Sequence, residues 1–593
     1  MQDHGIAFGD HIKSEKMHRR YKEGNYRYHM RGFFLLVFLC LGIGVLFIKV
    51  FSLQLVHGAY YRDLADSNRM RTRVIHAPRG VIFDRNKIPL VFNIPGFRQV
   101  SKDTSKIISR EESLALLAKG ATNLEIDSLR QYPLHDATAH VLGYIGQISK
   151  DELQRDEYST YQARDYLGKA GVEQSYESML RGTNGKQLIE IDAMGKPTRT
   201  LGQTDPIPGQ DITITLDSKL QAAAYEAMRT VKKGALIVST PDGQILSLIS
   251  KPSYDPNLFT MDESYKVASD SSYQKLSQVL LDGDTHPLLN RAIAGTYPPG
   301  STFKIVTAAS GLQNKIIDEK YTIVDTGVLT VGTFSYANWF YIEYGRKEEG
   351  EIDVRRALAR SNDIYFYKLA EKIGPAKLAE MSLKMGAGAV TGIDLYGEAK
   401  GIIPTETWKK AVIKEPWYLG DTFHYGIGQG FVLTTPLQVN TWTQVVANGG
   451  TLYEPRLLQA KKDSIKAKNI LDEKTLGLIR EGMIEACSPK GVAWPLFEFK
   501  VKNTNLKIDN KDIFAVEGAS GSAEMRKVSI ACKTGTAQHG GEQTLPHAWI
   551  TLFAPANKPE IVVTVLNESS GEGSNEAAPV AKKILEAWFG EKK

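Results

Sequence analysis

The most apolar part of the chain lies close to its N-terminus. Residues 33–48 contain no charged side chain, Lys49 interrupts the run, and residues 50–56 continue it. A membrane-spanning helix needs about 20 predominantly apolar residues, and a lysine near the end of such a helix reaches the headgroup region with its amine. The pattern therefore predicts a transmembrane anchor helix over residues 32–56.

The charges before this run predict its orientation. Residues 16–31 carry six Lys or Arg against one Glu, which is typical of a cytoplasmic flank. We therefore expect residues 1–31 to be a cytoplasmic tail and everything after residue 56 to lie outside the cytoplasm. A cleaved signal peptide is the alternative, but no small-residue cleavage site follows the run, and Leu39 before Cys40 is a poor lipoprotein context.

Short alternating runs predict a mostly β-structured segment after the helix. Residues 57–215 contain such runs, separated by turns such as Gly-Thr-Asn-Gly at 182–185. Residues 211–216 alternate like a strand and lead into a predicted helix that starts at Ser218. We interpret residues 57–215 and 216–593 as two domains that this helix links.

The second of these segments has strands at both ends and helices between them. Apolar runs at 235–239 and 244–249 flank Pro-Asp-Gly, which is a strong hairpin signal. The last helix places several apolar residues on one face. This order predicts an α+β domain in which helices cover an antiparallel sheet. The remaining predicted strands are 528–532, 549–553 and 561–566, and the apolar residues of the last helix are Val580, Ile584, Leu585 and Trp588.

Composition narrows the class of protein. The 593 residues are enough for two or more domains, and 42% hydrophobic with 24% charged residues is ordinary for globular protein. The net charge of +6 is modest, and no stretch interleaves basic and aromatic residues on a recognisable nucleic-acid-binding module, so we expect no nucleic-acid partner. Three cysteines do not make a disulfide framework, and we expect the exported part to need no oxidative folding. Strand alternation predicts that Cys532 is buried and faces away from the side chain of Lys533.

A serine and a lysine one turn apart form the first candidate catalytic pair. Tyr-Pro-Pro-Gly at 297–300 precedes Ser301, and a helix is predicted from Phe303 onward. Lys304 lies on the same face of that helix, one turn later. A serine hydroxyl becomes a nucleophile when an adjacent base takes its proton, and a neutral lysine is such a base. The helix dipole and a second lysine, Lys533, are expected to lower the pKa of Lys304.

The Ser-x-x-Lys pattern becomes a specific signal only when two other motifs of the same family of enzymes accompany it. Ser272 and Lys275 fit it as well, but they lie in a polar stretch that we interpret as a solvated loop. Ser301, in contrast, is followed by Ser-Asn-Asp at 361–363 and by the chain's single Lys-Thr-Gly at 533–535. A trio of this kind is typical of penicillin-binding proteins and β-lactamases. We therefore predict that Ser301 is a nucleophile rather than a helix-capping serine.

Longer motifs extend this resemblance over nearly the whole chain. They resemble the elongation-type class B penicillin-binding proteins, the penicillin-binding protein 2 family. The resemblance implies a penicilloyl-serine transferase fold for residues 216–593, on an elongated, β-rich, dimerisation-type pedestal domain at 57–215. The motifs that carry it are 251–257, 290–301, 426–430 and 435–438 in the second domain, and 79–85, 140–146 and 180–182 in the pedestal.

The same resemblance implies a peptidoglycan D,D-transpeptidase reaction. Ser301 attacks the penultimate carbonyl of a D-Ala-D-Ala stem peptide and releases the terminal D-Ala. The acyl group then passes to an amine of a neighbouring stem and forms a 4,3-type cross-link. Lys304 takes the serine proton, and Ser361 relays a proton to the leaving amine.

The Lys-Thr-Gly-Thr strand is implied to hold the substrate. Lys533, Thr534 and Thr536 receive the substrate carboxylate, and Gly535 lets the substrate backbone lie close to the strand. The backbone N–H groups of Ser301 and Thr536 form the oxyanion hole.

Asp363 departs from the wider superfamily, which usually carries Ser-x-Asn, although Ser-x-Asp resembles the elongation subfamily. An aspartate beside two lysines is ionised and balances their charge. The alternative is that Asp363 merely caps the helix predicted from residue 364.

We expect neither a metal nor another cofactor. Some members of the family look metal-binding between the first two motifs, but residues 305–360 contain no His or Cys. The glycines at 426–430 lack the spacing of a nucleotide loop. His424, His539 and His547 are scattered, and we expect them to be structural or exposed.

Other functional classes remain as alternatives. A D,D-carboxypeptidase or a β-lactamase-like hydrolase has the same nucleophile, but the chain lacks the Glu-x-x-Leu-Asn string of class A lactamases. A non-catalytic β-lactam sensor needs a signalling module, for which residues 1–31 leave no room. A bifunctional polymerase is disfavoured because residues 57–215 lack a Glu-Asp-x-x-Phe string. The sequence leaves the acceptor amine and the β-lactam profile open.

A monofunctional transpeptidase cross-links strands that another enzyme makes. The resemblance therefore implies a SEDS-type (RodA-like) membrane glycosyltransferase as a partner, β-lactams as ligands, and a single-pass protein of the bacterial inner or cytoplasmic membrane. The head segment at 86–139 is short for the family, so we expect a head-bound elongation scaffold to bind weakly.

Overall fold

The computed structural model describes residues 15–101, 104–121, 123–192, 196–509, 511–517, 524–541 and 543–591. These residues divide into two compact units. The first comprises the described parts of Met1–Ile75 and Gly185–Asp205, and the second those of His76–Asn184 and Pro206–Lys593.

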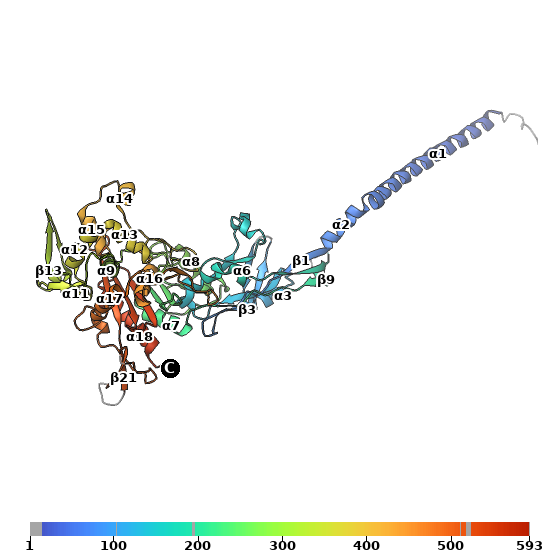
Figure 1. Ribbon diagram of the computed structural model, residues 1–593. Coiled ribbons are helices and arrows are strands. Elements are labelled where there is room, and N and C mark those ends of the chain that lie inside the picture. Colours follow the sequence, from blue (N-terminus) through green and yellow to red (C-terminus); the bar gives the residue numbers. More distant parts are fainter. Residues whose placement is uncertain are drawn as a thin grey trace, which may run out of the picture. The chain divides into compact units, whose positions relative to one another are not determined.

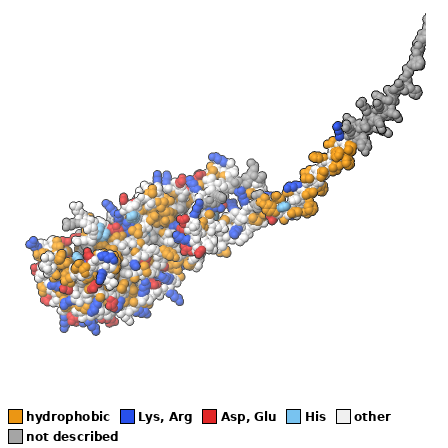
Figure 2. Space-filling model, turned by 90° about the horizontal axis from the view of Figure 1, so that it is seen from above, with side chains coloured by type: hydrophobic (Ala, Val, Ile, Leu, Met, Phe, Trp, Pro, Cys, Tyr) orange, Lys and Arg blue, Asp and Glu red, His pale blue; other side chains and the backbone are white. Residues whose placement is uncertain are grey.

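The first unit contains the long apolar helix. Helix α1 (Glu15–Phe51) continues through one π-helical turn, η1 (Ser52–Val56), and is followed by α2 (Gly58–Arg69). Among the described residues, Met30–Val56 is the one helical stretch long and apolar enough to cross a membrane, with a mean hydropathy of 2.8. Its apolar side chains are exposed and form a continuous surface along the helix (Figure 2). The stretch contains the predicted helix over 32–56.

A small antiparallel sheet completes this unit. Its strand order is β1 (Met70–Ile75), β8 (Gly185–Ile191) and β9 (Pro197–Thr204). Glu190 on the central strand pairs with Arg69 and with Arg199. The predicted β-rich character of this part of the chain is confirmed.

The pedestal residues of the second unit form another, curved sheet. The long strand β3 (Pro89–Val100) pairs with three neighbouring strands, and a fourth joins at one end. Residues 211–216 form a strand over only two residues, because Ile214 leaves the sheet to bridge Leu458. The other elements are β2 (Ile82–Phe83), β4 (Ser105–Ile108), β5 (Leu124–Gln131), β6 (Ile145–Gln147), β7 (Tyr166–Gly168), β10 (Ile212–Thr213), α3 (Arg110–Ala118), α4 (Ala139–Leu142), α5 (Gly171–Ser175) and α6 (Glu177–Leu180).

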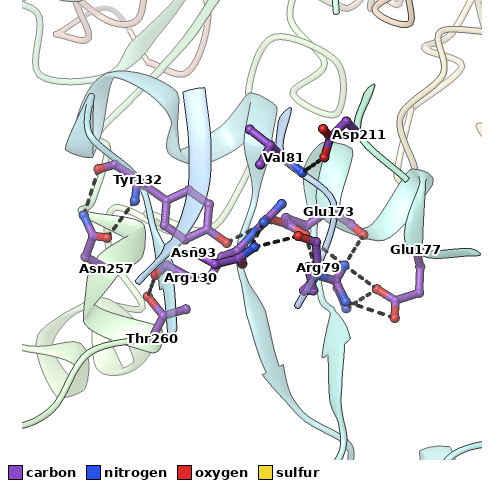
Figure 3. A network of polar contacts seen from close by, with 11 residues as sticks. Arg79, Val81, Asn93, Arg130, Tyr132, Glu173, Glu177, Asp211, Asn257 and Thr260 are labelled. Atoms are coloured by element: carbon purple, nitrogen blue, oxygen red, sulfur yellow. Dashed lines mark hydrogen bonds and ion pairs between the residues drawn. The ribbon is translucent and has the colours of Figure 1, made fainter. Parts of the chain in front are cut away.

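A buried polar network lies inside the pedestal, and hydrogen bonds beside it reach residues 257 and 260 of the rest of the second unit (Figure 3). Glu173 is fully buried and accepts from Arg130 at 2.6 Å and from Arg79 at 2.8 Å. The neighbouring main chain of Tyr132 exchanges two 2.9 Å hydrogen bonds with the Asn257 side chain. A buried charge is stable only when it is paired in this way. The motif residue Arg79 is therefore a structural anchor of the pedestal.

The part of the second unit after residue 215 is built on a five-stranded antiparallel sheet. Its strand order is β12-β11-β24-β23-β22, so the two N-terminal strands (green) and the three C-terminal strands (red) join in one sheet (Figure 1). This confirms the sheet predicted from strands at both ends of the segment. The strands are β11 (Gly234–Ser239), β12 (Ile245–Lys251), β22 (Ala531–Ala537), β23 (His547–Ala554) and β24 (Ile561–Asn567).

Helices cover both faces of this sheet. On one face, α7 (Ser218–Ala227) and α18 (Ala578–Phe589) enclose an apolar core that includes Ile584 and Leu585, as predicted. On the other face, α16 (Pro436–Ala447) lies against three of the strands, and a larger helical layer surrounds the buried Trp442. That layer consists of α9 (Lys304–Gln313), α11 (Val354–Ala359), α12 (Asp363–Ile373), α13 (Pro375–Lys384), α15 (Leu419–Gly426) and α17 (Glu473–Ala486).

The other α-helices and β-strands of the second unit are short and do not belong to these layers. They are α8 (Leu276–Leu281), α10 (Trp339–Glu343), α14 (Glu406–Val412), and the paired strands β13 (Thr322–Asp325) with β16 (Gly350–Asp353), β14 (Val328–Val331) with β15 (Phe334–Ala337), β17 (Leu452–Tyr453) with β18 (Ile465–Ala467), and β21 (Glu524–Val528) with β19 (Lys500–Val501) and β20 (Ile513–Glu517).

Two expectations about the last third of the chain are wrong. The predicted strand at 528–532 is divided, because Ser529 and Ile530 separate β21 from β22 and the two strands belong to different sheets. Cys487 and Cys532 form a disulfide bond, although the cysteine count predicted none. Their positions are distant in sequence, and only the packing of α17 beside β22 brings them together.

Candidate active site

Ser301 stands in a short 3-10 turn, η6 (Gly300–Phe303), that continues directly as α9. Gly300 has a φ of +54°, and a Cβ atom there would lie 3.1 Å from the carbonyl oxygen of Thr536. Glycine adopts this conformation without strain, so the turn can approach strand β22 closely. The predicted helix entry is confirmed, and it places Ser301 beside the Lys-Thr-Gly strand.

The glycine loop at 426–430, one of the motifs of the family resemblance, supports this turn. The Gly300 amide donates to the carbonyl of Gly428 at 2.9 Å, and a Cβ atom at Gly428 would lie 2.4 Å from the Gly300 oxygen. The Gln429 side-chain amide pairs with the main chain of Gln538, just after β22. The loop thus joins the nucleophile turn to the end of the strand. The glycine spacing at 426–430 was the available signal.

Lys304 is completely buried at the centre of the site. Its Nζ donates to the Ser361 carbonyl oxygen and to Asp363 Oδ1, each at 2.7 Å, and lies 3.4 Å from Ser361 Oγ. Burial lowers the pKa of Lys304, and the Asp363 carboxylate opposes that shift. The predicted pKa direction agrees, but its main cause is desolvation rather than a neighbouring lysine.

Ser361 and Asp363 reach Lys304 through an unusual local backbone. Ser361 has a φ of +53°, which is uncommon for a residue other than glycine. Asn362 caps α12 by accepting from the Tyr365 amide at 2.8 Å. Asp363 is therefore not the helix cap, and its second carboxylate oxygen accepts from the Trp339 amide at 3.1 Å. The alternative interpretation of Asp363 as merely a cap is wrong.

Lys533 projects from β22, the edge strand of the sheet. Its side chain is fully buried, and its Nζ donates to the Thr534 carbonyl at 3.0 Å. Burial and the charge of Lys304 lower the pKa of Lys533 well below its usual range, while Asp363 opposes them. Two lysines and one carboxylate therefore share one buried site.

The rest of the Lys-Thr-Gly-Thr motif follows along the same edge. Thr534 is buried, whereas Thr536 is exposed and its hydroxyl accepts from the Gly573 amide at 3.4 Å. A Cβ atom at Gly535 would lie 3.1 Å from both the Thr302 and the Trp549 side chains. This glycine is closely packed beneath the nucleophile turn, and its role in substrate clearance stays a prediction.

Trp549 and Glu568, which no sequence motif indicated, hold the entry to the nucleophile turn together with two residues of the motif at 290–301. Trp549 Nε1 donates to the Pro298 carbonyl at 3.1 Å. The hydroxyl of Tyr297 donates to Glu568 at 2.6 Å, and Arg291 pairs with the same carboxylate at 2.7 Å. Isolated Trp and Glu residues far along the chain from Ser301 carry no local signal of this role.

The rival residues and the histidines lie elsewhere. Ser272 and Lys275 are exposed in a loop and at a helix start, as predicted. His424 is exposed on α15, and His547 is buried and stacked on His539 with ring centroids 3.7 Å apart. Burial and the neighbouring ring lower the pKa of His547 to about 4.

Comparison with known families decides the class. The penicillin binding protein transpeptidase domain matches residues 234–586, and the penicillin-binding protein dimerisation domain matches residues 97–214. The chain belongs to the penicillin-binding protein transpeptidases. The predicted family and the predicted fold class of this penicillin-binding protein are both confirmed.

Curated relatives resemble the penicillin-binding protein over most of its length. It is 30% identical to the peptidoglycan D,D-transpeptidase MrdA of Haemophilus influenzae over 609 residues, which cover 93% of this chain and 90% of the relative. It is 31% identical to the protein of the same name from Escherichia coli K12 over 586 residues, 89% of each chain.

Solved structures are similar as well. The complex between penicillin-binding protein PBP2 and MreC from Helicobacter pylori has a TM-score of 0.69 at 28% identity and covers 87% of this chain and 98% of that one. PBP2 of Pseudomonas aeruginosa in complex with WCK 5153 has a TM-score of 0.65 at 31% identity, over 87% and 96%. A structure of a peptidoglycan synthase complex that coordinates polymerization and crosslinking has a TM-score of 0.69 at 26% identity, over 94% and 98%.

Proposed function

We propose that this penicillin-binding protein is a peptidoglycan D,D-transpeptidase that cross-links stem peptides during cell-wall elongation and is acylated by β-lactams. The observation that carries the proposal is the convergence of three motifs on one buried amine. Lys304, one turn after Ser301, lies 2.7 Å from Asp363 and 3.4 Å from the Ser361 hydroxyl. Lys533 from the distant edge strand shares the electrostatics of that site.

The reaction begins at the Ser301 hydroxyl. Its oxygen forms a bond to the penultimate D-Ala carbonyl carbon while its proton passes to Lys304. The backbone N–H groups of Ser301 and Thr536 hold the developing oxyanion. The C–N bond to the terminal D-Ala then breaks, and the proton reaches the leaving amine through Ser361. An amine of a neighbouring stem attacks the acyl-enzyme, and the new amide releases Ser301.

The charge distribution supports Lys304 as the base. A lysine accepts a proton only when it is neutral, and burial favours the neutral form. Burial lowers the pKa of Lys304 and Lys533, and the charge of Lys304 lowers that of Lys533 further. The pair therefore releases a proton more easily than an isolated lysine does, and Asp363 balances the charge that remains.

The substrate carboxylate is assigned to the edge strand. Among the described strands β22 pairs only with β23, so an extended peptide can add to its other side as a further strand. Lys533 supplies the positive charge, and Thr534 and Thr536 are the hydroxyl donors.

A partition experiment separates this function from hydrolysis. The purified protein is incubated with a D-Ala-D-Ala pentapeptide donor, with and without an amine acceptor, and the products are measured by mass spectrometry. We expect the cross-linked amide to exceed the hydrolysed tetrapeptide when the acceptor is present. A D,D-carboxypeptidase or a β-lactamase-like hydrolase gives only the tetrapeptide or opened β-lactam, and that outcome contradicts the proposal. A non-catalytic β-lactam sensor gives neither peptide product.

The chain's organisation fits an anchored enzyme with an extracytoplasmic catalytic domain. We propose a tail at 1–31, an anchor at 32–56, a pedestal at 57–215 and a transpeptidase domain at 216–593. The basic flank before the apolar helix supports a cytoplasmic N-terminus. Protease added outside spheroplasts should digest the chain beyond residue 56 and spare an N-terminal tag, and loss of that tag contradicts this topology.

We also propose that the anchor helix contacts a SEDS-type (RodA-like) polymerase. The chain carries no polymerase motif, and a solved relative belongs to a peptidoglycan synthase complex. Gly42 and Gly44 leave open space on the helix surface, which allows a partner helix to approach closely.

Replacing residues 33–56 by an unrelated anchor is expected to abolish co-purification with the polymerase, because the swap removes that helix surface. Penicillin acylation should remain at the wild-type rate, which serves as the control for folding. Full recovery of the polymerase with the swapped protein contradicts the proposed contact.

A further inference from the structure

The Cys487–Cys532 disulfide lies directly beside the catalytic motif. Cys487 follows the last residue of α17, and Cys532 is the second residue of β22, immediately before Lys533. Their Cα atoms are 5.9 Å apart, and the two residues are 7% and 0% exposed. The bond therefore joins a helix end to the strand that carries Lys533, within the apolar core.

Helix α17 contacts the elements of all three motifs. It packs against α9, which begins with Lys304, and against α11, which leads to Ser361. The contact with α11 is tight, because a Cβ atom at Gly482 would lie 2.8 Å from the Leu358 side chain. It also packs against β22, where the disulfide attaches it covalently. Helix α17 therefore contacts all three motif-bearing elements and fixes the position of the third motif relative to the first two.

The start of β22 needs such an attachment. Among the described strands β22 hydrogen-bonds only to β23, because it is the edge of its sheet. The segment before it comes from a separate small sheet through Ser529 and Ile530. The hydrogen bonds of its own sheet therefore hold β22 from one side only, and packing against η6 and α17 holds it elsewhere. A displacement of about 1 Å at a catalytic group costs on the order of 100-fold in rate.

We propose that the Cys487–Cys532 disulfide is a positioning cross-link that holds Lys533 in register with Lys304, and that a thiol–disulfide oxidoreductase forms it before the domain closes. Both thiols lose a proton, and two electrons pass to the disulfide of the oxidoreductase, which leaves as a dithiol. The mature bond is buried, so an external reductant does not reach it in the folded enzyme. This inference rests on the proposed function, since its readout is acylation of Ser301.

The test compares Cys487→Ala, Cys532→Ala and the double variant with the wild type. The measured quantity is the rate constant of acylation by a fluorescent penicillin, at a temperature where each protein is folded. We expect all three variants to be slower by about tenfold, and to the same extent, because each removes the same bond. If Cys487→Ala acylates at the wild-type rate while Cys532→Ala does not, the effect belongs to one side chain and the proposal is wrong.

A matched control separates positioning from general stability. Leu585→Ala on α18 removes a buried side chain from the same apolar core, far along the chain from the motifs. It should lower the melting temperature and leave acylation unchanged. Wild-type rates in the three cysteine variants overturn the proposal, whatever their melting temperatures.

If the cysteine variants do not fold, a refolding experiment with the wild type tests the proposal instead. The protein is denatured, reduced, and refolded with or without a glutathione redox buffer, and its thiols are counted by iodoacetamide labelling and mass spectrometry. We expect fast acylation only in the fraction without free Cys487 and Cys532. Equal acylation of the oxidised and reduced fractions contradicts the cross-link. If oxidised wild type shows no acylation at Ser301, the proposed function fails instead.

Discussion

Ser301→Ala is expected to abolish covalent labelling by benzylpenicillin, with a loss in acylation rate of about 10³-fold or more. The serine oxygen is the atom that forms the acyl bond, and no other hydroxyl stands one turn before the buried Lys304. Intact mass spectrometry of the wild type should show one added penicilloyl group, and peptide mapping should place it on the peptide that contains Ser301.

Ser272→Ala is the matched control for this prediction. Ser272 precedes a lysine by the same spacing, but it is exposed in a loop and Lys275 is exposed as well. Ser272 therefore lacks the buried lysine that follows Ser301. The variant should label like the wild type. An adduct on Ser272, or one that survives in Ser301→Ala, contradicts the assignment of the nucleophile.

Lys304→Arg is expected to slow acylation by about 10³-fold, because a guanidinium retains the positive charge but does not release its proton. The substitution therefore separates a base from a mere partner of Asp363. The acylation rate of the purified protein is measured from pH 6 to pH 10, an interval that ends near the usual pKa of lysine. Acylation of Lys304→Arg at the wild-type rate shows that Lys304 is not the base.

Two further variants serve as controls for the interpretation of Lys304→Arg. Lys251→Arg changes another buried lysine, which lies over the Tyr225 ring, and should leave acylation intact if burial of an arginine is tolerated in general. Asp363→Asn removes the carboxylate that raises the pKa of Lys304. Its acylation should therefore reach half-maximum at a lower pH than in the wild type, even though its maximum rate falls. A shift toward higher pH contradicts this electrostatic account.

The sequence was sufficient wherever neighbouring residues decide the outcome. The strand pair at 235–249, the face of the closing helix with Ile584 and Leu585, and the turn before Ser301 follow from periodicity and from proline and glycine positions. The motif spacing also identified Lys304, Ser361 and Asp363 as candidates, and the structure brings these three side chains together.

The cause assigned to the pKa of Lys304 was less accurate than the identification of the residue. That pKa was attributed to charge, yet burial is the main cause. For Gly535 the structure adds close packing against Thr302 and Trp549 to the predicted role in substrate clearance. Both findings concern how much protein surrounds a residue, and burial depends on elements that are distant in the sequence.

The amino-acid sequence by itself determined the long apolar helix near the N-terminus, the α+β order of elements and the trio of motifs, because these follow from local periodicity and spacing. The tertiary structure alone decided the Cys487–Cys532 bond, the support of Ser301 by Gly428, and the shared electrostatics of Lys304 and Lys533. Each of these is a contact between segments that are far apart along the chain. Such contacts form only when helices and strands pack, and a local pattern does not specify their partners.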